Sequence, residues 1–157
     1  MTVLLIFIAA NLVAASSGAI FKPGDWYESL AKPWWRPPNW LFAPAWMVLY
    51  LLNAIAGARV YEAATPDALP ALMGLYGLSL ALNAAWSGFF FGLKRPDWAL
   101  GELALLWLSV LGQVIAFSGV DETAAWLNVP YLAWVSFAGV LNFAMWRLNR
   151  ERILSRI

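Results

Sequence analysis

Few side chains in this sequence could take part in chemistry, and the most conspicuous are indoles and amides within apolar stretches. The chain has no cysteine and no histidine, which excludes thiolate nucleophiles, cysteine-bound metals and the commonest general base. Three tryptophans each share a predicted helix face with an asparagine: Trp46 with Asn53, Trp86 with Asn83, and Trp134 with Asn142. Such faces, turned toward each other, predict an apolar cavity with a few polar contacts, which suits a flat hydrophobic ligand. Packing of the rings against one another is the alternative interpretation.

Another apolar stretch of the sequence carries three polar residues at helical spacing. Glu102, Ser109 and Gln113 are spaced by seven and four residues, which places them on one side of a helix and predicts that they point into a bundle. Polar groups inside membrane helices mark functional sites by default. For Asn53, Ser109 and Gln113 we favour hydrogen bonds between helices. Glu102 lies about one helical turn from the charged segment KRPD, so the alternative for this residue is that it reaches the membrane interface.

The elements that must position these residues are membrane helices. Of the 157 residues, 62% are hydrophobic and 12% are charged, against roughly 45–50% and ~25% in soluble domains. A membrane helix needs about 20 apolar residues. The sequence therefore predicts a single all-α integral membrane domain of five transmembrane helices, at about 2–21, 41–62, 69–92, 97–118 and 124–148. No cation precedes Lys22, so we interpret the first stretch as a retained helix, not a signal peptide.

The charge distribution predicts the orientation of these five helices. One side of the membrane would carry nine of the ten cations, Lys22, Lys32, Arg36, Lys94, Arg95, Arg147, Arg150, Arg152 and Arg156, and the other only Arg59. Because cytoplasmic segments are enriched in Lys and Arg, we expect segment 22–40 and the C-terminus in the cytoplasm and the N-terminus outside. The same bias favours a cell membrane of the cytoplasmic type over an outer membrane.

Four segments carry a family resemblance that runs along nearly the whole chain. WYESLAKPWWRPP, NWLFAPAWMVLY, LALNAAWSGFFFG and VPYLAWVSFAGVLNFAMWRLN resemble the tryptophan-rich sensory protein and translocator protein family, also called the peripheral benzodiazepine receptor family. The resemblance implies a five-helix bundle that binds porphyrins such as protoporphyrin IX, sterols and benzodiazepine-site ligands beneath its first loop. By motif position, the implied pocket residues are Tyr27, Trp46, Asn83, Trp86, Phe89, Phe90, Trp98, Trp134, Ala138 and Leu141.

One departure from the family pattern concerns sterols. The proposed sterol motif needs a leucine or valine, a tyrosine and a basic residue; this chain has Leu141 and Arg147 but Phe143 in the middle. The motif is a weak indicator even when complete, and without the hydroxyl group we do not predict cholesterol as the natural ligand. A metal-free porphyrin is the favoured ligand, because its ring can stack on indoles and no histidine is present to bind haem iron. No metal site, resident cofactor or nucleic-acid partner is predicted.

The segment KPWWRPPNW at positions 32–40 is predicted to stay extended, because Pro37 and Pro38 disfavour helix there and at the residue before each. Our hypothesis is a loop cover. Trp34 and Trp35 would close the cavity, and Lys32 and Arg36 would pair with ligand carboxylates. Anchoring of the indoles at the membrane interface is the alternative.

Three functions remain open at this stage. They are a tetrapyrrole receptor or sensor, an enzyme that degrades protoporphyrin with light and oxygen between Trp46 and Trp134, and a transporter. The sequence lacks paired helix breaks in two halves, which disfavours an alternating-access transporter. Small residues on the third helix, Gly77, Ala81 and Ala85, together with the resemblance, predict a homodimer through that helix. Close packing within one bundle is the alternative for this ladder.

Overall fold

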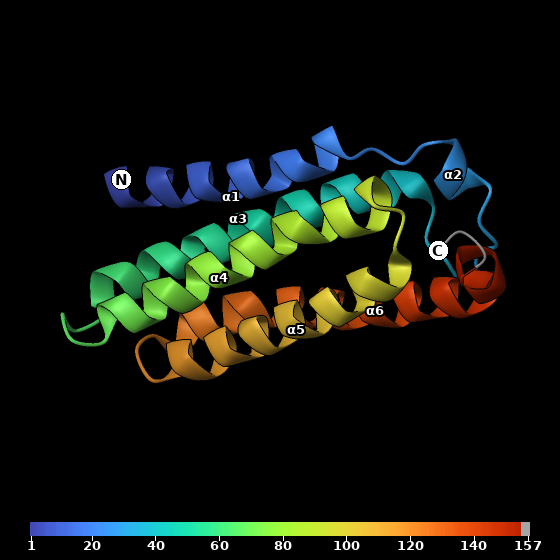
Figure 1. Ribbon diagram of the computed structural model, residues 1–157. Coiled ribbons are helices and arrows are strands. Elements are labelled where there is room, and N and C mark those ends of the chain that lie inside the picture. The colour runs from blue at the N-terminus through green and yellow to red at the C-terminus, as the bar shows by residue number, and fades with distance from the viewer. Residues whose placement is uncertain (155–157) are drawn as a thin grey trace.

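The computed structural model describes residues 1–154, and all of its regular structure there is helical (Figure 1). Five long helical segments are present, as predicted: α1 (Thr2–Ile20), α3 (Asn39–Ala63), α4 (Leu69–Ser87) with its continuation η1 (Gly88–Gly92), α5 (Pro96–Ser118) and α6 (Glu122–Leu154). Each is long and apolar enough to cross a membrane. The all-α class and the five-helix transmembrane bundle are therefore confirmed.

Two details differ from the sequence-based expectation. The last helix begins at Glu122 and continues to Leu154, beyond the transmembrane segment predicted at about 124–148; a charged helical extension outside a bilayer leaves no hydropathy signal. The segment between α1 and α3 holds a short helix, α2 (Asp25–Glu28), that was not predicted. Arg156, one of the cations behind the orientation prediction, lies outside the described residues.

Local sequence explains where several helices begin and change. Proline stands in the first turn of α4 and of α5, where its missing N–H costs nothing because that group has no helical partner anyway. At the start of α6, the backbone N–H of Ala124 donates to Asp121 Oδ1 over 2.9 Å, which caps the helix. The sequence GFFFG forms the π-helix η1, whose wider turn shifts the register of the side chains that follow.

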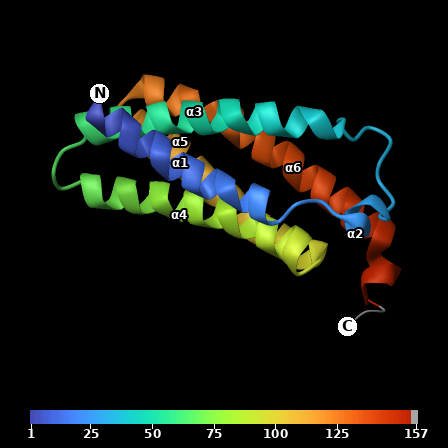
Figure 2. The same cartoon turned by 90° about the horizontal axis from the view of Figure 1, so that it is seen from above.

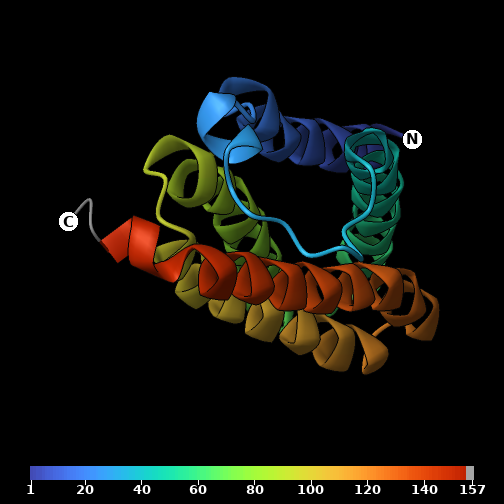
Figure 3. The ribbon, with the colours of Figure 1, turned by 90° about the vertical axis from the view of Figure 1, so that its right-hand side faces the viewer.

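The helices form a ring in the order α1, α3, α6, α5, α4, which the end view shows (Figure 3). Helix α1 runs obliquely between α3 and α4, its two neighbours in this ring (Figure 2). Its first half contacts α3, where the ring of Phe7 lies 6.0 Å from that of Tyr61. Beyond its other end, Phe21 lies against Gly88 and Gly92 of η1. Helices α1 and α3 therefore diverge toward the end of the bundle that carries α2.

Candidate functional site

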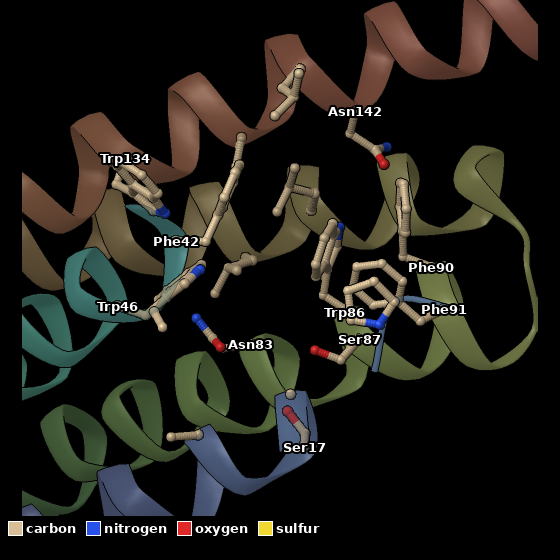
Figure 4. Close-up of a pocket in the computed structure, with 18 of the residues that line it drawn as sticks. Ser17, Phe42, Trp46, Asn83, Trp86, Ser87, Phe90, Phe91, Trp134 and Asn142 are labelled. Atoms are coloured by element: carbon tan, nitrogen blue, oxygen red, sulfur yellow. The ribbon is translucent and has the colours of Figure 1, made fainter. Parts of the chain in front are cut away.

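A cavity of about 440 Å³ lies between the helices in the half of the bundle that carries α2, within the usual size range of small-molecule sites. Residues of all five long helical segments line it (Figure 4). Eight of the ten predicted pocket residues are among them: Tyr27, Trp46, Asn83, Trp86, Phe90, Trp134, Ala138 and Leu141. The fold thus brings together side chains from the segment before α3 and from three different helices.

Phe89 and Trp98, the other two predicted pocket residues, do not line this cavity. Their rings contact each other at 6.4 Å, and the guanidinium of Arg95 lies 4.6 Å from the ring of Trp98, which is 54% exposed. Phe89 was implied by motif position alone, and it does not share the helix face of Asn83, Trp86 and Phe90, which do line the cavity; the wider turn of η1 adds Phe91 to that face.

Several wall residues were not predicted as pocket residues. They include Phe42 and Met47 of α3, Phe91 of η1, Asn142 and Met145 of α6, and a small-residue stretch of α1, Ala15, Ser17, Gly18 and Ala19. Asn142 carried a signal, because it shares the predicted face of Trp134. The α1 residues carried none, since small side chains line a cavity only if the neighbouring helix leaves room. Met47 is 72% exposed, so the cavity opens on the side where α1 and α3 diverge.

The aromatic rings of the wall meet mostly edge to face. Trp46 contacts Trp134 at 6.3 Å and Tyr131 at 6.1 Å between centroids, and Phe42 contacts Trp134 at 5.9 Å. On the other side, Trp86 stacks on Phe90 at 5.0 Å. Figure 4 shows these two aromatic groups facing the space between them. Edge-to-face contacts hold rings apart at wide angles, so the packing of the tryptophans and the presence of a cavity are compatible.

Asn83 is fixed by two tyrosines from neighbouring helices. The hydroxyl of Tyr50 donates to Asn83 Oδ1 over 2.6 Å, and Asn83 Nδ2 donates to the Tyr131 hydroxyl over 2.7 Å. These bonds join α3, α4 and α6 beside the cavity. Asn83 therefore holds the wall in place, and both its Oδ1 and its Nδ2 already bond to protein groups.

Asn142 presents the opposite arrangement. Its Nδ2 donates to the backbone carbonyl of Pro96 over 2.9 Å, which ties α6 to the start of α5. Its Oδ1 is buried and has no hydrogen-bond partner among residues 1–154. Trp86 Nε1, also on the cavity wall, is likewise buried without a partner in that part of the chain.

None of the four predicted loop-cover residues lines the cavity. Lys32 and Arg36 nevertheless contact Tyr27, which does: Lys32 Nζ lies 4.8 Å from the Tyr27 ring centroid, and Arg36 Nη1 donates to the Tyr27 hydroxyl over 3.2 Å. Trp35 packs on Phe137 at 6.0 Å. The prediction that Trp34 covers the cavity is corrected, because the N–H of Arg36 donates to the carbonyl of Pro33 and the resulting turn leaves Trp34 94% exposed.

The predicted interhelical hydrogen bonds are present for two residues and absent for one. Asn53 Nδ2 donates to Asn11 Oδ1 over 3.0 Å. Gln113 Nε2 donates to Ser79 Oγ, and Gln113 Oε1 accepts from Asn128 Nδ2 over 3.1 Å. For Ser109 the prediction is wrong: its hydroxyl donates to the carbonyl of Leu106 in its own helix. A serine can bond back to the preceding turn, which no spacing rule excludes.

Glu102 and the small-residue ladder also have definite places. Glu102 is only 7% exposed and neither carboxyl oxygen has a partner among residues 1–154, so the alternative of reaching the interface is wrong.

Gly77 and Ala81 are exposed on α4, and a Cβ built on Gly77 would meet nothing within 4 Å. The ladder at these two positions is therefore not used for packing within the bundle.

Five spans around an internal aromatic cavity define a polytopic membrane protein with room for a small apolar molecule. The chain belongs to the TspO/MBR family, whose family model matches residues 2–147. It is 44% identical over 150 residues to the protein CrtK of Rhodobacter capsulatus, with 95% of this chain and 94% of the relative covered. It is 41% identical to the tryptophan-rich sensory protein of Cereibacter sphaeroides, with 94% and 92% covered. It is 37% identical to the translocator protein of Homo sapiens, with 91% and 88% covered.

Proposed function

We propose that the protein is a membrane receptor or sensor that binds flat hydrophobic ligands, with protoporphyrin IX as the first candidate, in the cavity beneath the segment between α1 and α3. The observation that carries this proposal is the cavity wall. Trp46, Trp86 and Trp134 line one space of about 440 Å³, and indole faces and edges are good partners for a flat aromatic ring. The name of the relative in Cereibacter sphaeroides, a tryptophan-rich sensory protein, supports a sensory role.

The charged groups beside Tyr27 support a ligand that carries carboxylates. Lys32 and Arg36 both contact this wall residue from outside the cavity. Lys32 Nζ lies 3.6 Å from the carboxylate of Glu28 and donates to the backbone carbonyls of Glu28 and Leu30; the Glu28 side chain is 59% exposed, so its carboxylate is the partner that a ligand carboxylate can replace most easily. An apolar ring in the cavity would then place its acidic substituents toward this end of the bundle.

Binding is tested by titrating the purified protein with protoporphyrin IX and following tryptophan fluorescence. A saturable quenching curve is expected for the wild type, and Trp134→Phe should weaken binding because it removes part of the wall. Trp98→Phe is the matched control, since Trp98 lies outside the cavity. Equal affinity of the wild type and of Trp134→Phe would overturn the site assignment, and a wild type that does not bind would overturn the function.

The role of the cations is tested with the double variant Lys32→Gln and Arg36→Gln. We expect weaker binding of protoporphyrin IX, because two charge partners are lost, and unchanged binding of its uncharged dimethyl ester. If both ligands lose affinity equally, the segment serves only as an anchor or as a structural support of Tyr27.

One observation favours a second candidate function, the degradation of porphyrin by light and oxygen. Trp46 and Trp134 lie edge to face at 6.3 Å on the same wall, where two oxidisable indoles would flank a bound ring. Illumination of the complex in air separates the two functions. Bleaching no faster than in detergent alone supports a receptor, whereas faster bleaching that Trp134→Phe slows supports an enzyme.

Assembly and orientation complete the proposal. The exposed Gly77 and Ala81 support a homodimer through α4, and the cation bias supports a cytoplasmic location of the end that carries α2. Because the chain contains no cysteine, variants with a single cysteine can test both the dimer and the orientation. Gly77→Cys should form crosslinks between chains in membranes while Gly101→Cys on α5 should not, and a cysteine at Trp34 should react only with reagents applied from the cytoplasmic side.

A further inference from the structure

Two asparagines on the cavity wall differ in which of their amide atoms have a hydrogen-bond partner. Figure 4 shows Asn83 on α4 and Asn142 on α6 at separate places around the cavity. Asn83 uses its oxygen on the Tyr50 hydroxyl and its nitrogen on the Tyr131 hydroxyl. Among residues 1–154, Asn142 uses only its nitrogen, on the Pro96 carbonyl. Of the two, only Asn142 keeps a buried amide oxygen without a partner among residues 1–154.

The orientation of the Asn142 amide follows from chemistry. A backbone carbonyl is an acceptor only, so the group that bonds to Pro96 must be the nitrogen. The oxygen is consequently the free atom, and it belongs to a residue that is 2% exposed and lines the cavity. Neither water nor lipid outside the bundle can pair with an oxygen buried this far, and an unpaired buried acceptor is costly.

Other buried oxygens without partners in residues 1–154 do not compete for a ligand. They belong to Asn53, Glu102 and Asn128, and none of these residues lines the cavity. On the wall itself the buried side-chain atoms without a partner in this part of the chain are Asn142 Oδ1, an acceptor, and Trp86 Nε1, a donor. Of these two buried atoms, only Asn142 Oδ1 calls for a hydrogen-bond donor from within the cavity.

We propose that Asn142 determines ligand specificity: its Oδ1 accepts a hydrogen bond from an O–H or N–H group on the periphery of the bound ring. The inference rests on the proposed function and names the ligand class more narrowly. The favoured ligand is a flat ring that carries, besides any carboxylate that meets Lys32 or Arg36, one peripheral donor such as an alcohol, a secondary amide or a protonated carboxylic acid. A site that pairs with a donor rejects analogues that lack it, because the buried acceptor then stays unpaired.

The test uses two uncharged porphyrins with the same heavy atoms. A deuteroporphyrin dimethyl ester with a 1-hydroxyethyl substituent has a peripheral donor, and its acetyl analogue has the same skeleton with an acceptor only. We expect the wild type to bind the alcohol about tenfold more tightly, the ratio for one hydrogen bond of ordinary strength. In Asn142→Leu the two affinities should become equal.

Two matched variants separate recognition from structure. Asn142→Asp keeps an oxygen acceptor and, when protonated, a donor for the Pro96 carbonyl, so it should retain the preference for the alcohol. Asn83→Leu removes the amide that already bonds to Tyr50 and Tyr131. It should lower the affinity for both porphyrins by the same factor and therefore keep the preference for the alcohol. Because each result is a ratio measured on one protein, partial misfolding of a variant leaves it unchanged.

The outcomes are distinct. A wild type that binds both porphyrins equally, or an Asn142→Leu variant that keeps the tenfold ratio, overturns the role of Asn142 and leaves the proposed binding function standing. A wild type that binds neither of these porphyrins nor protoporphyrin IX overturns the proposed function, and the inference with it; binding of protoporphyrin IX alone overturns only the inference.

Discussion

The two halves of the bundle use similar side chains in opposite ways. In the half that contains the N-terminus, here called the closed half, Asn11 Nδ2 donates to the Tyr76 hydroxyl, and Asn53 and Gln113 bond to side chains of neighbouring helices. In the half that carries α2, the hollow half, aromatic rings meet edge to face around the cavity, and the oxygen of Asn142, without a partner among residues 1–154, belongs to the cavity wall; the unpaired oxygens of Asn53 and Asn128 in the closed half do not.

The difference comes from the size of the neighbours. In the closed half, Gly57 lets α3 approach so near that an added Cβ would lie 2.6 Å from Phe7 Cδ1 and from Tyr76 Cε2. In the hollow half, large rings on α3, α4 and α6 face small residues of α1, such as Gly18, where an added Cβ would meet nothing within 4 Å. The closed half should therefore govern stability, and the hollow half should govern binding.

The strongest test of this division is the same substitution made in each half. Gly57→Ala should destabilise the protein by roughly 1–3 kcal/mol, because it overpacks the contact with Phe7 and Tyr76. Gly18→Ala has room for its methyl group and should leave stability unchanged or slightly raised. Thermal unfolding in detergent, followed by tryptophan fluorescence, measures both. Equal melting temperatures for the two variants would contradict the division.

The converse test fills the hollow half. Ala138→Phe places a ring in the cavity and should reduce affinity for protoporphyrin IX at least tenfold, about 1.4 kcal/mol. The melting temperature should stay close to that of the wild type, because the new ring occupies open space. Fluorescence quenching and thermal unfolding on the same preparation check the pair of expectations. A large drop in melting temperature would show that the cavity wall is also needed for stability.

A smaller effect is expected from the hydrogen bonds of the closed half. Gln113→Leu removes the bonds to Ser79 and Asn128 and should cost about 1 kcal/mol, given on the order of 0.6 kcal/mol per such bond in membranes. Affinity for protoporphyrin IX should not change. Ser118→Ala is the control, since its hydroxyl bonds only to Ile115 of the same helix and is exposed. Weakened porphyrin binding in Gln113→Leu would indicate that the two halves are coupled.

The smallest effect is the pH dependence of stability that Asp121 causes in the closed half. The N–H of Ala124 and the guanidinium of Arg59, 2.8 Å away, hold the pKa of Asp121 below its usual range. The stabilisation by the charged form is therefore complete above the unfolded pKa of about 3.9 and is lost as the pH falls through the lower folded value.

The variant Asp121→Asn isolates this charge, because asparagine is also a good N-cap. It should be less stable than the wild type by under about 1 kcal/mol near neutral pH, since Arg59 is well exposed. The difference should shrink as the pH falls below about 4. A difference in melting temperature that stays constant down to pH 3 would show that the charge of Asp121 contributes nothing.

Much of the site could be predicted from sequence because helical spacing and family motifs converge on the same faces. Trp46, Asn83, Trp86 and Trp134 were predicted from their positions and do meet around one cavity. Phe89, which only the motif position implied, lies outside the cavity, whereas Phe90, which shares the face of Asn83 and Trp86, lines it. Trp34 failed because a turn at Pro33 and Arg36, not the proline pair, sets its direction.

The sequence by itself determined the five spans, since a bilayer offers no partner for free backbone groups and an apolar run of sufficient length must become a helix. The motifs likewise determined which rings would gather. Only the tertiary structure decided how α1 closes the bundle and where hydrogen bonds are already complete. Whether Asn83 or Asn142 keeps a free oxygen depends on Tyr50, Tyr131 and Pro96. These partners come from other helices, and no local pattern in the chain encodes their distance.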